Sequence, residues 1–224
     1  MRHLLPLLLL ASPVVAADEK FTPLFNGQDT TGWTFTLRPP ADKPDSKPDP
    51  KDTFSVKDGV LVCTGKPNGY IATAKEYEDY VLRLKWRFPK DSKGGNSGVL
   101  LHCTGDDKVW PHSIEAQLKA GQAGDLWLNA NKDNMLPKLD TAADRKDAKN
   151  ARHTFRIGKD DSIEKPFGEW NEYEITCKGG DITLVVNGKT VNEGKNGELK
   201  KGRIALQSEG VPIEFKDIEI QAVK

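Results

Sequence analysis

The stretch NEYEITCKGGDITLVVNG, residues 171–188, contains the clearest fold signal in the chain. Apolar and polar residues alternate in 171–177 and again in 181–186, and each run ends at a dipeptide, Gly179-Gly180 or Asn187-Gly188. Gly-Gly and Asn-Gly are favoured in two-residue hairpin turns because both central positions of such a turn need a positive φ. The stretch therefore predicts an antiparallel meander of three strands.

The same two-residue period occurs elsewhere in the chain. Residues 80–88 place apolar side chains on one face and basic side chains on the other: Leu82, Leu84, Trp86 and Phe88 against Arg83, Lys85 and Arg87. A change of phase at Lys216-Asp217 predicts a β-bulge in the last strand, with two short strands on different faces as the alternative. No long stretch has helical periodicity, so we predict an all-β fold, an antiparallel β-sandwich with long surface loops.

The first 17 residues have the features of a secretory signal peptide. A positive residue, Arg2, precedes the apolar run Leu4–Leu10, and small residues around Ala16 and Ala17 suit cleavage. The run is too short to span a bilayer. We therefore expect one domain over residues 18–224 that is secreted or periplasmic, with no membrane insertion after the signal is removed.

The charge balance gives no reason to expect a polyanionic partner. The chain has 33 basic and 33 acidic residues, and loss of Arg2 with the signal leaves 32 against 33. A nearly neutral protein has no long-range attraction for a phosphate backbone or an anionic membrane. We predict no nucleic-acid partner.

Three cysteines remain in the expected mature chain, Cys63, Cys103 and Cys177, and each lies in an apolar, strand-like run. Small buried thiols are the simplest interpretation. One disulfide with one free thiol is the alternative for an exported protein with an odd count.

Two segments are predicted to be long surface loops. Residues 38–53 carry five prolines among charged and polar residues, and residues 130–166 are polar and rich in charge. Pro-rich polar segments favour extended loops, and loops this long in a compact domain are often functional.

Glu115 and Gln117 are the first candidate site residues. They share one face of a predicted strand, residues 113–118, whose other face is apolar. A carboxylate in a groove can act as a general base, and an amide beside it can hold a hydroxyl group. An ordinary solvated strand face has the same pattern, so the pattern alone leaves both interpretations open.

Three further candidates lie at strand ends. Arg87 ends its strand on the polar face, and a guanidinium can grip two oxygen atoms at once. Asn96 belongs to Asn96-Ser97-Gly98, which precedes an apolar strand, and it is expected at the rim of a groove. A simple turn before the strand is the alternative. His102 has the opposite parity to Leu101 and is expected to face the groove, with a hydrogen-bonded strand-end histidine as the alternative.

Asp125, Trp127 and Gln207 complete the candidates. Asp125 and Trp127 share parity after a glycine-containing turn, so they are either a second carboxylate with a stacking platform or a strand-entry residue with a core aromatic. Gln207 ends a strand and is expected to complete the groove.

Several short motifs follow one another along nearly the whole expected mature chain. They are Leu24-Phe25-Asn26-Gly27 with Gly32-Trp33, Gly95-Asn96-Ser97-Gly98-Val99, Ile114-Glu115-Ala116-Gln117, Gly168-Glu169-Trp170-Asn171-Glu172-Tyr173, Gly202-Arg203-Ile204-Ala205-Leu206-Gln207 and Phe215-Lys216-Asp217-Ile218-Glu219-Ile220. In this order the chain resembles the 3-keto-disaccharide hydrolase domain family. It departs from the family at Lys85, where members often carry a carboxylate.

The resemblance implies a concanavalin A-like jelly roll that cleaves the glycosidic bond of 3-keto-disaccharides or other 3-keto-glycosides by elimination and hydration. It implies Glu115 as the base and Arg87 or His102 as the group that polarises the ketone, with a divalent cation as a possible addition. The residues expected to contact the substrate are Asn96, Gln117, Asp125, Trp127 and Gln207.

Two other functions stay open at this stage. The same groove, amides and aromatic rings suit a lectin-like module that binds glycans without cleaving them. An ordinary glycosidase would pair Glu115 with Asp125 or Glu169 and would act on unoxidised sugars.

Overall fold

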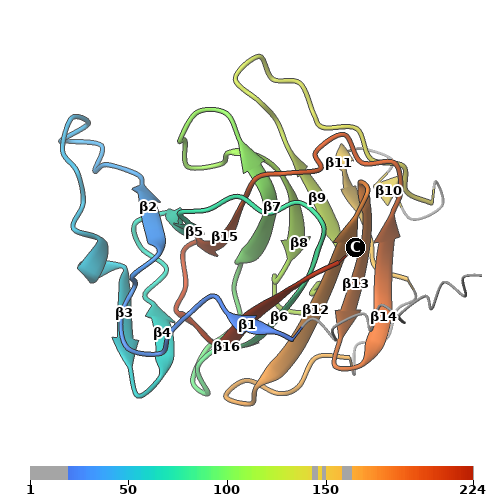
Figure 1. Ribbon diagram of the computed structural model, residues 1–224. Helices are drawn as coiled ribbons and strands as arrows, with labels where there is room; N and C mark the ends of the chain where they lie inside the picture. Colours follow the sequence, from blue (N-terminus) through green and yellow to red (C-terminus); the bar gives the residue numbers. More distant parts are fainter. Residues whose placement is uncertain (1–19, 143–145, 148–149, 158–162, 224) are drawn as a thin grey trace, which may run out of the picture.

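The computed structural model describes residues 20–142, 146–147, 150–157 and 163–223. The predicted signal peptide, residues 1–17, lies outside the described residues. Two antiparallel sheets pack face to face (Figure 1), which confirms the predicted β-sandwich.

The first sheet, called sheet A here, has the order β14-β13-β12-β6-β16-β4-β3, and β1 pairs with β16. Its strands are β1 (Thr22–Pro23), β3 (Phe54–Lys57), β4 (Val60–Cys63), β6 (Tyr80–Arg87), β12 (Asn171–Lys178), β13 (Asp181–Val186), β14 (Lys189–Gly194) and β16 (Ile213–Ala222).

The second sheet, sheet B, has the order β10-β11-β9-β8-β7-β15-β5-β2. Its strands are β2 (Trp33–Leu37), β5 (Gly69–Thr73), β7 (Gly98–Thr104), β8 (His112–Gln117), β9 (Leu126–Asn129), β10 (Lys146–Asp147), β11 (Asn150–Thr154) and β15 (Arg203–Ser208). A single 3-10 turn, η1 (Pro50–Asp52), follows the capping carboxylate of Asp49.

The core lies between the two sheets and is built from the apolar face of each strand. Leu82, Leu84 and Trp86 of β6 are at most 1% exposed, as their period-two pattern predicts. Sheet B contributes Ile114 and Ala116 of β8, both fully buried. The alternate residues of each strand therefore point away from the core, onto the outer face of their sheet.

The predicted turns and bulge are confirmed. β12, β13 and β14 form the meander, with positive φ at both residues of Gly179-Gly180 and of Asn187-Gly188. β16 is one continuous strand, and its pairing with β6 shifts register between Lys216 and Glu219, where Asp217 has a φ of 50°.

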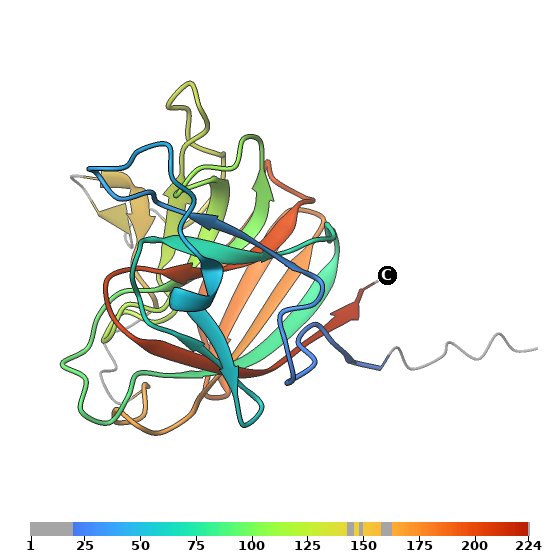
Figure 2. The same cartoon turned by 90° about the vertical axis from the view of Figure 1, so that its left-hand side faces the viewer.

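One loop prediction needs correction. Residues 130–166 were expected to form a surface loop, but this segment contributes β10 and β11 to the edge of sheet B. Residues 38–53 do form a loop outside the sheets, apart from η1. The loops after β2, β7 and β9 project from the same end of the sandwich (Figures 1 and 2).

The three cysteines are buried and unpaired, as the simpler interpretation had it. In the part of the chain that the structure describes, no helix has the length and apolar character needed to cross a membrane.

Candidate active site

A pocket of about 510 Å³ opens on the outer face of sheet B, above β8, β9 and β11. Its lining combines carboxylates, amides, a histidine and aromatic rings: Asn96, Trp110, Glu115, Gln117, Lys119, Gln122, Trp127, Asn129, His153, Phe155 and Glu209. Pockets that combine a few polar groups with aromatic walls are typical of small-molecule sites.

Strand register brings the main side chains into one row. Glu115 of β8 is paired with Trp127 of β9, and Trp127 is paired with His153 of β11. Because paired residues of neighbouring strands point to the same face, all three project outward, side by side. The sandwich thus carries this row on a rigid sheet.

Glu115 lies deep at the floor of the pocket and is 3% exposed. Its Oε2 atom accepts a hydrogen bond from Asn129 Nδ2 at 3.1 Å. Burial raises the pKa of Glu115 to about 8, and the nearby Glu209 carboxylate adds to the rise, while hydrogen bonds from Asn129 and Gln207 oppose it. At neutral pH most Glu115 side chains therefore keep their proton.

Glycine at position 98 leaves room for this arrangement. A Cβ atom there would come within 2.5 Å of Glu115 Oε1 and 2.7 Å of Gln207 Oε1, so both side chains lie across the bare backbone of β7. Gln207 is 2% exposed, and among the described residues its Oε1 has no hydrogen-bond partner. The Oδ1 atom of Asn96 is likewise buried without a partner there. An unsatisfied acceptor beside Glu115 and another on a residue of the pocket lining favour a ligand that donates hydrogen bonds, such as a polyol.

His153 is held by Asp125. Asp125 is 1% exposed; its Oδ1 accepts from the backbone N–H of Arg156 at 2.7 Å, and its Oδ2 lies 2.8 Å from His153 Nε2. Because a carboxylate only accepts, Nε2 carries the proton of the neutral ring, and the lone pair of that tautomer is on Nδ1. The ring lies between Trp127, at 5.1 Å, and Phe155, at 4.4 Å between centroids.

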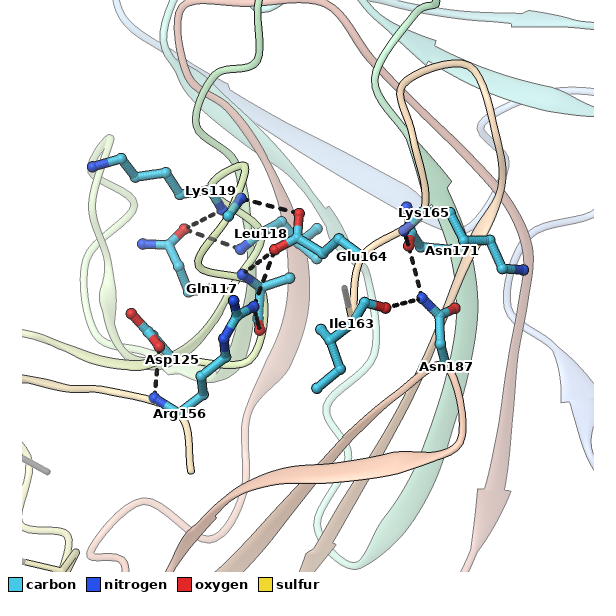
Figure 3. Close-up of polar contacts among 12 residues, drawn as sticks. Gln117, Leu118, Lys119, Asp125, Arg156, Ile163, Glu164, Lys165, Asn171 and Asn187 are labelled. Atoms are coloured by element: carbon cyan, nitrogen blue, oxygen red, sulfur yellow. Dashed lines mark hydrogen bonds and ion pairs between the residues drawn. The ribbon is translucent and has the colours of Figure 1, made fainter. Parts of the chain in front are cut away.

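A set of polar contacts surrounds Asp125 and the loop that leads to it (Figure 3). Glu164 accepts from the backbone N–H groups of Gly121 and Ala123, and from Arg156 Nη1 at 3.3 Å. The Gln117 Oε1 atom accepts from the N–H groups of Leu118 and Lys119, both at 3.0 Å. The loop between β8 and β9 is therefore fixed at several points along the stretch that leads to Asp125.

Glu209 is a second carboxylate of the pocket. Burial raises its pKa, while a hydrogen bond from Asn96 and the charge of Lys119 oppose the rise. Asn96 also forms an isolated backbone bridge with Glu209. The rim above Glu115 therefore holds an acidic, an amide and a basic group together.

The structure places four of the predicted residues, Asn96, Glu115, Gln117 and Trp127, in the pocket lining. Gln207 lies beside Glu115, and Asp125 is hydrogen-bonded to the pocket residue His153. Trp127 is therefore a groove residue, which answers the question that its parity left open.

The expected position of His102 is wrong. The pairing of β7 with β8 shifts register between Leu101 and Thr104, and His102 has a φ of 53°. This bulge turns the ring away from the groove, so its Nδ1 lies 2.9 Å from Leu199 O and its Nε2 lies 3.2 Å from Glu78 O. Burial lowers the pKa of His102, and the ring meets Tyr80 edge to face.

The expected position of Arg87 is also wrong. Arg87 belongs to sheet A, where its Nε pairs with Glu214 Oε2 at 2.6 Å and its guanidinium lies 4.3 Å from the centre of the Trp170 ring. It lines a different depression together with Glu169. Glu169, the expected partner of Glu115 in an ordinary glycosidase, lines this depression and does not line the pocket of Glu115.

The sequence patterns did not predict His153, Glu209 or Trp110 as site residues. His153 lies in the segment predicted to be a loop, residues 130–166, although it alternates with Arg152 and Thr154 in a short strand-like run. Glu209 and Trp110 lie just outside strands, where the two-residue alternation does not predict which way a side chain points.

In the described ranges, no group of three or more His, Cys, Asp or Glu side chains is arranged to hold a metal ion. The divalent cation that the family resemblance allows as an addition to the mechanism stays a prediction.

Solved structures with the same architecture act on or bind carbohydrates. A proposed glycosyl hydrolase from Parabacteroides distasonis ATCC 8503 superposes with a TM-score of 0.62 at 23% identity, covering 91% of this chain and 94% of that one. The Bacillus licheniformis β-glucanase gives 0.55 at 11% identity, over 92% and 98%. The carbohydrate-binding module CBM66 from Bacillus subtilis gives 0.56 at 10%, over 86% and 96%. At these identities the likeness establishes the shared jelly-roll fold.

A search of curated protein sequences gave no significant match. The sequence pattern of one domain family does match, over residues 20–221, which is almost the whole described chain and agrees with the resemblance inferred from the short motifs. The chain belongs to the family of 3-keto-alpha-glucoside-1,2-lyase-like domains.

Proposed function

We propose that this protein is an exported enzyme that cleaves the glycosidic bond of 3-keto-glycosides by elimination, followed by hydration. The observation that carries the proposal is the pair formed by buried Glu115 and Asp125-held His153, which face one pocket from the two sides of Trp127. Family membership supports the substrate class.

The chemistry needs one base and one hydrogen-bond donor. A ketone at C3 acidifies the hydrogen on C2, so a base can remove that proton while the electron pair moves toward the ketone oxygen. The C1–O bond then breaks, C1=C2 forms, and the departing alcohol takes up a proton. Water adds across this double bond to give the free 3-keto sugar, so the net reaction is hydrolysis and no redox partner is needed.

His153 is the proposed base. Its Nδ1 carries the lone pair because Nε2–H is directed at Asp125, and Asp125 is fixed by the Arg156 N–H. A carboxylate behind the ring also stabilises the imidazolium that forms when the proton is taken, as in other histidine–aspartate pairs.

Glu115 is the proposed donor to the ketone oxygen. The family resemblance implies Glu115 as the base, but a pKa raised to about 8 by burial keeps it protonated at neutral pH. A neutral carboxylic acid in a dry site can donate a hydrogen bond to a developing enolate. Unpaired Asn96 Oδ1 and Gln207 Oε1 would accept from the sugar hydroxyls.

The first experiment measures product release from 3-keto-trehalose and from a 3-keto-glucoside, each beside its unoxidised parent, with and without chelator. We expect cleavage of the keto forms only. Cleavage of the parents would instead indicate two-carboxylate hydrolysis, with Glu209 as the partner of Glu115. Sugar binding with no product from any substrate would point to a lectin-like module. Loss of activity with chelator, restored by a divalent cation, would add a metal to the mechanism.

The pH profile of kcat/KM separates the two roles of Glu115. If Glu115 donates, kcat/KM falls as the pH rises through about 8; if it is the base, kcat/KM rises to a plateau above that pH. We expect Glu115→Gln to lose the alkaline fall and to retain part of the activity, because an amide still donates. Glu174→Gln, on the outer face of sheet A, is the matched control and should leave the profile unchanged.

A further inference from the structure

The outer face of sheet B is divided into an open half and a covered half. On the covered half five side chains form a separate buried cluster, each at most 1% exposed: Tyr70, Ala72, Leu100, Cys103 and Ala205. They belong to β5, β7 and β15 and are not part of the core between the sheets. Something must therefore shield this half of the face from water.

The loop between β7 and β8, residues 105–111, is held to this half at several points. Asp107 accepts a hydrogen bond from the Tyr70 hydroxyl at 3.3 Å and forms an ion pair with Arg203 of β15. Lys108 Nζ donates to Ala130 O at 3.0 Å. The loop is thus tied to β5 and β15 of the covered half and, across the border, to the end of β9. Burial raises the pKa of Tyr70 to about 12.

Trp110 marks the border between the two halves. Its ring lines the pocket, and the Arg38 guanidinium lies 4.7 Å from the ring centre. Leu100 of the covered cluster is paired with Glu115 of the pocket, so the cover ends one strand away from Glu115. A sugar chain that crossed the sheet from β11 toward β2 would meet the loop directly beyond Glu115.

We propose that the β7–β8 loop closes the pocket on this side. The protein then accepts a 3-keto sugar only when that sugar is the terminal unit of its glycoside. Trp110, backed by Arg38, is the wall that this terminal ring meets. The inference rests on the proposed function for its substrate class. A 3-keto unit inside a chain carries a second sugar, and that sugar would occupy the volume of the loop.

The test compares two oligosaccharides of equal length, one with the ketone on the non-reducing terminal unit and one with the ketone on an internal unit. We expect kcat/KM to be at least 100-fold higher for the terminal ketone. Asp107→Ala combined with Lys108→Ala releases the loop, and Trp110→Ala removes the wall, so each should narrow the ratio at least tenfold. The neighbouring exposed residue Asp106, changed to Asn, is the matched control and should keep the ratio.

Equal rates on both substrates in the wild-type protein would overturn the inference, as would wild-type ratios in both loop variants. Binding separates this outcome from failure of the proposed function. In the His153→Ala variant, calorimetry should give at least tenfold tighter binding of the terminal ketone, whether or not the wild-type protein cleaves either compound. Equal affinities of this variant for the two compounds would contradict the closed pocket. They would not bear on the proposed cleavage reaction, which the product-release experiment tests.

Discussion

The outer faces of the two sheets carry polar residues at the same period, yet they differ in burial and in partners. On sheet A, Arg83 pairs with Glu174 and Lys85 lies 3.1 Å from Asp217, and these side chains are between 36% and 53% exposed. On sheet B, Glu115, Asp125 and Gln207 are at most 3% exposed, and their partners are amides, a histidine and backbone groups.

The difference shows which polar face can do chemistry. Exposed, mutually paired charges on sheet A are screened by water. Buried groups on sheet B have shifted pKa values and unsatisfied acceptors, which are features of functional sites.

Replacing His153 with Ala should have the largest effect. Removal of the proposed base should lower kcat/KM on a 3-keto-glucoside by roughly 10²–10⁴-fold. Asp125→Asn should also lower it, because an amide no longer fixes the proton on Nε2. Thermal unfolding of both variants controls for misfolding. More than a tenth of wild-type activity in the His153→Ala enzyme would show that His153 is not the base.

Gly98→Ala should act on the floor of the pocket. The new Cβ would come within 2.5 Å of Glu115 Oε1, so the carboxyl must move, and a displacement of about 1 Å can cost on the order of 100-fold in rate. Steady-state kinetics measures this loss. In a Glu115→Gln background the added loss should be much smaller, because both changes affect the same group. Additive losses would show that Gly98 acts elsewhere.

The buried Glu115 should make stability depend on pH. Its folded pKa of about 8 lies above the ordinary 4.5, so the folded state holds the proton more tightly than the unfolded state. This contribution is complete below about pH 4.5 and is lost as the pH rises through about 8. It amounts to at most about 5 kcal/mol. Urea unfolding from pH 5 to 9 should show a steeper fall in the free energy of unfolding for wild type than for Glu115→Gln. In that variant only the smaller contribution from the raised pKa of Glu209 remains. Parallel curves would contradict the raised pKa.

Period-two reasoning predicted what depends on one strand at a time. It gave the three-strand meander, the bulge at Lys216-Asp217 and the shared outward face of Glu115 and Gln117. It failed at His102 because a bulge within β7 changes the parity there, and a single residue with positive φ leaves no mark in the alternation.

The remaining errors concern pairing between distant strands. Arg87 and Glu115 both lie on polar strand faces, and only the strand order shows that β6 and β8 belong to different sheets. His153 and Glu115 share one face because β9 pairs with both β11 and β8. A single sequence cannot reveal this strand order, because it depends on contacts between residues far apart in the chain.

Arg87→Ala gives the smallest expected effect and tests the sheet A side of the contrast. The change removes a partly exposed ion pair with Glu214 and a stacking contact with Trp170, which together are worth about 0.5–2 kcal/mol. We expect kcat/KM to stay within twofold of wild type and urea unfolding to show this modest loss of stability. Glu214→Gln is the matched control, since it breaks the same ion pair and leaves the stacking in place. Because Arg87 lies on the sheet opposite the pocket, a tenfold loss of activity in a stably folded Arg87→Ala protein would mean that the outer face of sheet A also takes part in the reaction, and the contrast between the two faces would fail.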